Sequence, residues 1–239
     1  MTTDRAADVS AVGSADVGVL DHAVRSALTG PHAHFAERRG RVLRYPRDVS
    51  VYGDFPEDPT PQDWADAAEL YGPGADLPVS GDLPSPPPGW AVSMNIPGVQ
   101  MVGTNVWGAA DAEAVVLTRA DVPEMLALVG RTRPGPFLTR TIELGTYLGI
   151  RRGGELVAMA GERLHPVGWT EISAVCTDEA FRGQGLGTRL VLAVAAGIRA
   201  RGEIPFLHTA AANVTAIRLY EELGFVLRRT LTFGGIRIP

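Results

Sequence analysis

The segment from Val175 to Gly187 brings together residue types that can hold a negatively charged group. Its first residues have the apolar, β-branched character of a strand. Glycines follow at positions 183, 185 and 187, and a helical pattern begins at Thr188. Glycines let backbone N–H groups approach a ligand closely and point into one small space. The N-terminus of the helix adds the positive end of its dipole. The segment therefore predicts a pyrophosphate site, and with it a nucleotide-like cofactor.

The spacing of these glycines separates the known kinds of phosphate loop. A kinase-type P-loop ends in Gly-Lys-Ser/Thr, which Gly187-Thr188-Arg189 does not supply. The dinucleotide fingerprint G-x-G-x-x-G needs a glycine at Thr188 or Leu190, and neither position has one. What remains is Arg-x-x-Gly-x-Gly, from Arg182 to Gly187. It resembles the acyl-CoA pyrophosphate loop of the GCN5-related N-acetyltransferase (GNAT) superfamily. A glycine turn that serves only strand–helix packing is the alternative.

A second motif follows the first by one predicted helix and one predicted strand. The segment Asn213–Phe225 resembles the other signature of the same superfamily, Asn-x-x-Ala-x-x-Leu-Tyr-x-x-x-Gly-Phe, at every position. The neighbouring segments Thr141–Tyr147 and Glu171–Thr177 resemble the FR47-like branch of the superfamily. The resemblance covers residues from about Val115 to Phe233.

The resemblance implies an α/β (mixed α+β) fold, with a mostly antiparallel sheet that is flanked by helices and splays at the strand ending in Thr177. It also implies acetyl-CoA as cosubstrate, no metal, and direct transfer of the acetyl group to a primary amine of a small molecule or peptide in a ternary complex. The residues it assigns to cofactor binding are Val175, Cys176, Thr177, Arg182, Gly183, Gln184, Gly185, Leu186, Gly187, Thr188, Asn213, Ala216 and Tyr220. Arg189 is a further source of positive charge beside the loop.

Three residues are candidates for the proton transfers that this chemistry requires. Tyr220 matches the family's general acid for the leaving thiolate. An alkyl ammonium has a pKa of about 10.4, so a base helps at neutral pH. Glu171 and His208 occupy the two positions at which relatives carry a catalytic glutamate, and we prefer Glu171 because it keeps that residue type. The alternatives are a solvated carboxylate and a hydrogen-bonded core imidazole. Cys176 is interpreted as a small buried hydrophobic residue, not a nucleophile.

Composition indicates an ordinary globular protein and excludes several classes of function. Hydrophobic residues make up 45% of the 239 residues and charged ones 21%. The net charge of −5, with no clustered basic patch, argues against a nucleic-acid surface. One cysteine cannot form an intramolecular disulfide, and no apolar run reads as a signal peptide or a membrane span. We therefore expect a cytoplasmic protein with no nucleic-acid or membrane partner, either a monomer or a homodimer.

Three regions are predicted along the chain: a disordered tail over 1–16, an α/β region of unknown role over 17–110, and the acetyltransferase domain over 111–239. One interpretation of the second region is a degenerate half-copy of the acetyltransferase fold. Helices are predicted over 20–28, from 58–64 to 70, over 121–129 with a capping box starting at Asp121, over 186–198 and over 213–222. Strands are predicted over 41–45, 49–52, 91–96, 99–102, 114–117, 147–150, 156–161, 170–177, 206–209 and 226–233.

Two other functions remain open from the sequence. The chain could use a longer acyl-CoA, as the glycine N-acyltransferase-like relatives do. It could also be a non-catalytic acetyl-CoA-binding sensor, although a pure binder has no need of a proton donor such as Tyr220.

Overall fold

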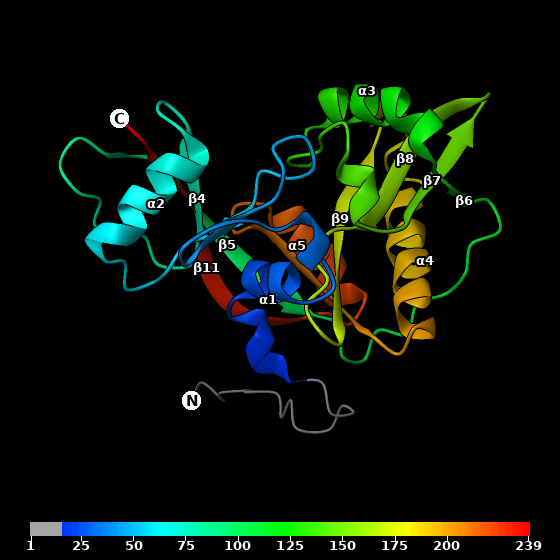
Figure 1. Cartoon of the computed structure of the whole chain (residues 1–239). Helices are drawn as coiled ribbons and strands as arrows, with labels where there is room; N and C mark the ends of the chain where they lie inside the picture. Colours follow the sequence, from blue (N-terminus) through cyan, green and yellow to red (C-terminus); the bar gives the residue numbers. More distant parts are fainter. Residues whose placement is uncertain (1–15) are drawn as a thin grey trace.

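An eight-stranded mixed sheet forms the centre of the computed structural model, which describes residues 16–239 (Figure 1). Its strand order is β4-β11-β5-β10-β9-β8-β7-β6. The strands are β4 (Asp76–Ser80), β5 (Ala91–Val102), β6 (Val115–Val116), β7 (Tyr147–Arg152), β8 (Glu155–Glu162), β9 (Trp169–Thr177), β10 (Ile204–Ala210) and β11 (Val226–Arg237). Neighbours are antiparallel except β9 and β10. All but Asp16 of the predicted tail over 1–16 lies outside the described residues.

The sheet opens between β9 and β10. These strands pair only from Ile204 opposite Trp169 to Phe206 opposite Glu171, and from there each strand continues without the other. The rest of β9 still pairs with β8 on its other side. The prediction of a mostly antiparallel sheet that splays at the strand ending in Thr177 is confirmed.

A β-bulge lies in the free half of β9. Ser173 is opposite Gly161 and Cys176 is opposite Met159, so β9 has one residue more than β8 in this interval. Ala174 within it has a φ of 53°, a left-handed conformation that is uncommon for a residue with a side chain. The bulge changes the direction of the strand at the point where it has left β10.

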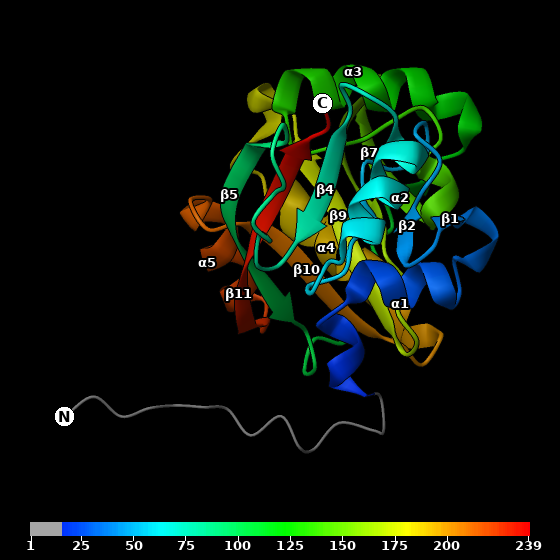
Figure 2. The same cartoon turned by 60° about the vertical axis from the view of Figure 1, so that its left-hand side comes forward.

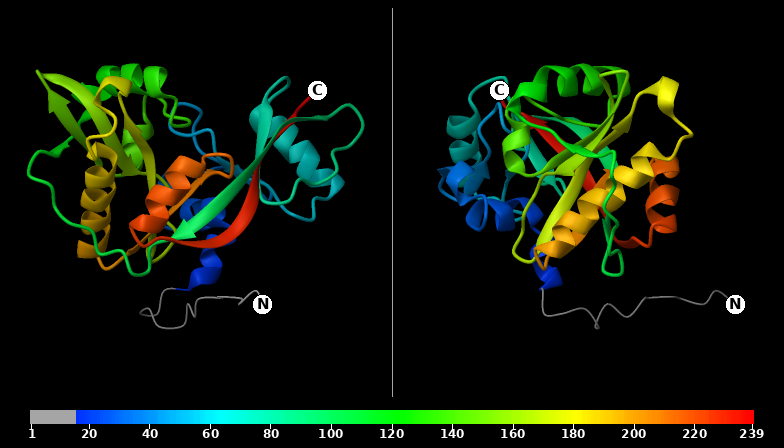
Figure 3. Two further views of the ribbon diagram at one scale, coloured as in Figure 1. Left: turned by 180° about the vertical axis from the view of Figure 1, so that it is seen from behind. Right: turned by 90° about the vertical axis from the view of Figure 1, so that its right-hand side faces the viewer.

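Helices cover both faces of the β7–β9 part of the sheet. α4 (Leu186–Ala200) packs on one face, and its buried residues include all five that its helical spacing predicted: Leu186, Leu190, Val191, Val194 and Ile198. α3 (Val122–Thr132) covers the other face through Met125 and Leu128, which share a core with Met159. α5 (Val214–Glu222) follows β10 and lies beside the opening, as the view from behind shows (Figure 3). None of the helices described over 16–239 has both the length and the apolar character needed to cross a membrane.

The N-terminal region forms a separate three-stranded sheet and two helices, and it also supplies β4 and β5 to the large sheet. Its elements are α1 (Ala23–Thr29), β1 (Glu37–Arg39), β2 (Val42–Arg44), β3 (Gly53–Asp54) and α2 (Pro61–Tyr71). β5 lies between β10 and β11, near the middle of the large sheet. The predicted boundary at residue 110 therefore does not coincide with an edge of the sheet. Figure 2 shows α2 packed beside β2 and β4.

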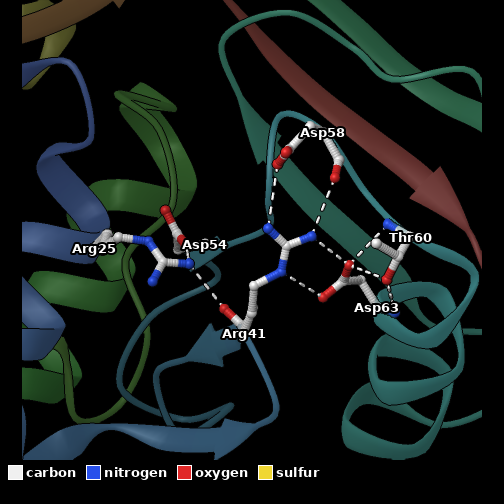
Figure 4. A network of polar contacts seen from close by, with 6 residues as sticks. All are labelled: Arg25, Arg41, Asp54, Asp58, Thr60 and Asp63. Carbon is white, nitrogen blue, oxygen red and sulfur yellow. Dashed lines mark hydrogen bonds and ion pairs between the residues drawn. The ribbon is translucent and has the colours of Figure 1, made fainter.

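A polar network ties the turn between β1 and β2 to the start of α2 (Figure 4). Thr60 and Asp63 form a capping box at the N-terminus of α2. The Arg41 guanidinium donates to both carboxylate oxygens of Asp63, at 2.6 and 3.0 Å. Arg25 of α1 donates in turn to the Arg41 carbonyl at 2.8 Å, so α1, the hairpin and α2 are held together.

Four predictions of local structure are corrected. The strand predicted over 49–52 is wrong, because Val49 and Ser50 donate back to the Pro46 carbonyl in a turn and β3 starts only at Gly53. The strands predicted over 91–96 and 99–102 are one continuous strand, since β11 pairs along its whole length. The first helix begins at Ala23, after a 3₁₀ turn. The capping box before α3 joins Thr118 to Asp121, one turn earlier than predicted.

Candidate functional site

The glycine-rich loop has the geometry of an anion cradle. Gly183 and Gly185 have φ of 76° and 72°, a region that favours glycine, and Gly185 is the N-cap of α4. A Cβ built at either glycine would meet no protein atom within 4 Å. The first N–H groups of a helix have no partner within the helix, and Gly185 has no side chain that could accept a hydrogen bond from them. Across residues 16–239, no N–H from Gly183 to Thr188 donates to another backbone or side-chain acceptor. The loop therefore fits a diphosphate.

The loop opens onto a cavity of about 1610 Å³ that passes through the opening between β9 and β10 and reaches β4 and β11. Its walls combine the acetyltransferase motifs with residues of the N-terminal region. Thirteen of the sequence-predicted residues line it: Val175, Cys176, Thr177, Arg182, Gly183, Gly185, Leu186, Gly187, Thr188, His208, Asn213, Ala216 and Tyr220. Gln184 and Glu171 do not line it.

The residues of the second motif stand beside the opening. Asn213 caps α5, because its Oδ1 accepts the Ala216 N–H at 3.2 Å. Tyr220 is 8% exposed and lines the cavity. Burial raises the pKa of Tyr220 to about 12, so the phenol keeps its proton at physiological pH.

Glu171 does not line the cavity and forms a buried ion pair with Arg163. Its carboxylate is fully buried and accepts two hydrogen bonds from the Arg163 guanidinium, at 2.6 and 2.8 Å. Burial alone would raise the pKa of Glu171, but the charge and hydrogen bonds of Arg163, together with the hydrogen bond from His208, outweigh it and lower the pKa to about 2. A carboxylate with such a low pKa is a weak base, and because it is fully buried a substrate in the cavity cannot contact it. Glu171, the base preferred from the sequence, is therefore not placed to take a proton from a substrate.

His208 is held between two partners. Its Nδ1 lies 2.7 Å from Glu171 Oε1, and its Nε2 lies 3.0 Å from the Gln100 amide nitrogen. The orientation of Gln100 is fixed, because the amide nitrogen donates to the Leu20 carbonyl and the amide oxygen accepts from Arg228. His208 therefore donates from Nδ1 to Glu171 and accepts at Nε2 from Gln100. No lone pair of the imidazole remains free for an acceptor amine.

Cys176 is buried in the core under α3. Burial raises the pKa of its thiol to about 11, which leaves it protonated and a poor nucleophile. Within residues 16–239, no three His, Cys, Asp or Glu side chains gather so that they could hold a metal ion.

Most of the arginines that surround the cavity were not predicted from the sequence as site residues. Seven line it: Arg44, Arg47, Arg133, Arg163, Arg182, Arg218 and Arg237. Only Arg182 belongs to the glycine-rich motif, and the others are brought together by strands and helices far apart in the chain. Arg189, which the sequence suggested as added charge, does not line the cavity. It pairs with Asp111 at 2.6 Å and with Glu113 at 2.6 Å.

Known proteins resemble this chain in sequence and in fold. The family model described as FR47-like protein matches residues 147–233. A solved structure described as a GNAT-family acetyltransferase from Novosphingobium aromaticivorans has 37% sequence identity and a TM-score of 0.84, and the match covers 92% of this chain and 98% of that chain.

Two curated relatives match in sequence alone. The N-alpha-acetyltransferase RimI of Mycobacterium tuberculosis is 33% identical over 131 residues, which are 48% of this chain and 81% of that protein. The mycothiol acetyltransferase of Thermobispora bispora is 40% identical over 83 residues, 31% of this chain, and the chain spans only 28% of that protein. The Novosphingobium structure and the RimI protein are both more than 30% identical to this chain and match it over most of their own length, and the sheet opens beside a diphosphate-fitting loop. The chain therefore belongs to the GNAT superfamily of acyltransferase enzymes, in its FR47-like branch.

Proposed function

We propose that this protein is an N-acetyltransferase that moves the acetyl group of acetyl-CoA directly to a primary amine within a ternary complex. The observation that carries the proposal is the row of N–H groups from Gly183 to Thr188, which have no acceptor among residues 16–239, at one end of a cavity that passes through the opened sheet. Relatives named as acetyltransferases support the reaction class. Acetyl-CoA supplies the activated thioester, and the residues of this chain bind it and orient it.

The diphosphate is held by the loop and by nearby cations. The N–H groups of the loop and the dipole of α4 favour a dianion there. Arg133, Arg182 and Arg218 line the cavity, and none of the three has an ion-pair partner among the described residues. Arg133 follows α3, whose Thr132 contacts Cys176 of β9, so this arginine lies near the strand that leads into the loop.

The free half of β9 holds the reacting end of the cosubstrate. Beyond Glu171 the strand has no partner on the β10 side, so its backbone groups can pair with the amides of the pantetheine arm. A backbone N–H between Val175 and Thr177 is our candidate donor to the thioester carbonyl, since a fixed donor stabilises developing negative charge without reorganisation. Asn213 and Ala216 border the same space from the α5 side.

Tyr220 is the candidate that assists the leaving sulfur. A thiol has a pKa of about 8.5, so complete proton transfer from a phenol with a pKa of about 12 is uphill by about 5 kcal/mol. We therefore assign Tyr220 mainly a hydrogen bond to the sulfur, which the protonated phenol can donate throughout the physiological range.

Neither Glu171 nor His208 has a free acceptor atom for the proton of the amine, because Arg163 and Gln100 occupy them. We propose that the hydrogen bond between His208 and Glu171 holds β10 and β9 in place at the point where the two strands separate. The ammonium then loses its proton to solvent in the open cavity, and the rate rises with pH until the amine is neutral.

The test is acetylation of an amine panel, followed by mass spectrometry, with Tyr220→Phe as the variant and Tyr147→Phe as the matched control. The Tyr147 hydroxyl is buried, has no hydrogen-bond partner in the described part of the chain and lies outside the cavity, so its loss should leave kcat unchanged. We expect Tyr220→Phe to lower kcat by about 100-fold, the usual effect of losing one preorganised donor. Undiminished turnover in Tyr220→Phe would remove this assignment. Tight binding of acetyl-CoA without turnover of any amine would support the sensor function instead.

A further inference from the structure

The charge of the cavity is opposite to that of the whole protein. The chain carries a net charge of −5, yet among residues 16–239 the cavity is lined by seven arginines and by two carboxylates, Asp76 and Glu222. Part of this positive charge lies beside the glycine-rich loop and suits a diphosphate. The remainder comes from four other arginines: Arg44 of β2, Arg47 of the turn after β2, Arg163 after β8 and Arg237 of β11.

The arginines of this second group differ in their partners. Arg163 is neutralised by Glu171, and Arg237 by Asp76 at 2.8 Å. Arg44 donates from Nε to Glu37 at 2.6 Å, and its buried Nη1 has no hydrogen-bond partner among the residues that the structure describes. Arg47 has no carboxylate within ion-pair distance among residues 16–239. Arg47 is therefore an uncompensated cation at this end of the cavity, and the charge of Arg44 lies beside it, paired with Glu37.

Both side chains are held by Tyr71, the last residue of α2. The Arg44 guanidinium carbon lies 5.3 Å from the centroid of the Tyr71 ring, a cation–π distance. Arg47 donates from Nη2 to the Tyr71 backbone carbonyl. A guanidinium fixed in this way loses little freedom when it binds a ligand, and it keeps other N–H groups for one. The packing of α2 beside β2, visible in Figure 2, thus positions a cationic site.

The rest of this end of the cavity is suited to an organic molecule. Met94, Ile96 and Phe233 present apolar surface from β5 and β11, and Tyr52 adds an aromatic face. No carboxylate there is free to attract an ammonium, because Asp76 is paired with Arg237. This end of the cavity therefore favours an acceptor that carries a negative charge.

We infer that the acceptor is an amine that also carries a carboxylate, and that Arg47 binds this carboxylate while the amine reaches toward the opening between β9 and β10. Two parallel N–H donors of a guanidinium match the two oxygens of a carboxylate. This inference rests on the proposed acetyl transfer and adds the class of acceptor to it.

The experiment uses the full chain with acetyl-CoA and matched pairs of amines. Each pair is a free L-amino acid and its primary amide, which keep the same amine and side chain and differ in the carboxylate. Phosphoethanolamine and ethanolamine form a further pair for the phosphate alternative. The variants are Arg47→Met, which keeps much of the aliphatic stem without the charge, and Arg47→Lys. Arg38→Met is the control, since Arg38 is exposed on β1 and does not line the cavity.

We expect at least one amino acid to be acetylated with a kcat/KM about 10- to 100-fold above that of its amide, as for the loss of one charge-assisted hydrogen bond. Arg47→Met should remove this preference mainly through KM, Arg47→Lys should keep part of it, and Arg38→Met should leave it unchanged. The affinity for acetyl-CoA and the unfolding midpoint of Arg47→Met should match the wild type, which shows that the variant is folded.

Two other results separate the inference from the function on which it rests. Equal turnover of acids and amides, or a preference for phosphoethanolamine over every amino acid, would overturn the inference while leaving acetyl transfer intact. Turnover of no pair by the wild-type protein would overturn the proposed function and the inference together.

Discussion

The role of Glu171 can be tested by Glu171→Gln, which keeps the size of the side chain and removes its charge. In the structure both carboxylate oxygens accept from Arg163, and Oε1 also faces His208. Removing the charge leaves the Arg163 guanidinium, whose side chain is 9% exposed, without its counterion. Breaking a buried pair in this way costs about 3–5 kcal/mol, which for a chain of this length lowers Tm by about 6–20 °C.

The pH dependence of the free energy of unfolding gives a second measure of the Glu171–Arg163 interaction. The pKa of Glu171 is lowered to about 2 from 4.5. A carboxyl whose pKa is lower in the folded state stabilises the protein above its unfolded pKa, and the contribution is lost as the pH falls through the folded pKa. The difference corresponds to about 3 kcal/mol, present above pH 4.5 and lost between pH 4.5 and about 2. Glu171→Gln should lack this part of the acid-induced loss of stability.

The assay combines thermal unfolding followed by circular dichroism, from pH 2 to 7, with acetyl transfer at a temperature where the variant is folded. Glu155→Gln is the control, because Glu155 is exposed in the β7–β8 hairpin and lies outside the cavity. We expect a large fall in Tm, a kcat within about 10-fold of the wild type, and an unchanged shape of the pH–rate profile. A wild-type Tm together with a loss of about 100- to 10,000-fold in kcat, the range for removal of a general base, would refute this reasoning and restore Glu171 as the base.

Two further predictions concern the cosubstrate loop and the extent of the folding unit. Gly185→Glu should abolish measurable binding of CoA in calorimetry, because it places a carboxylate where the diphosphate would lie and forces a φ of 72° on a residue with a side chain. Gly154→Glu, at an open turn position with a φ of 91°, should bind CoA normally, and equal affinities in the two variants would contradict the assignment of the loop. A fragment of residues 111–239 should remain unfolded by circular dichroism and NMR, since it lacks β5, which pairs with both β10 and β11. A cooperatively folding fragment would instead support the predicted boundary at residue 110.

The sequence by itself was sufficient for the superfamily, the backbone conformation of the glycine-rich loop and the elements around it. These features are local: a glycine permits a positive φ by its own chemistry, and the apolar period of α4 decides which of its residues are buried, as Leu190 and Ile198 show. The caps of α2 and α5 are local as well, because Thr60 and Asn213 bond to groups three residues away.

Contacts between distant segments were decided only by the tertiary structure. The sequence favoured Glu171 as a base because no local pattern indicates that Arg163 faces this carboxylate from across a turn. Nor does a local pattern indicate that Gln100, on a strand more than a hundred residues earlier, donates to the lone pair of His208 Nε2. The cationic end of the cavity likewise exists only because α2 packs beside β2 and brings Arg44 and Arg47 to Tyr71. Local patterns fix backbone conformation and burial, whereas the pKa of a group and its access to a substrate depend on charges and donors that the fold brings within a few ångströms.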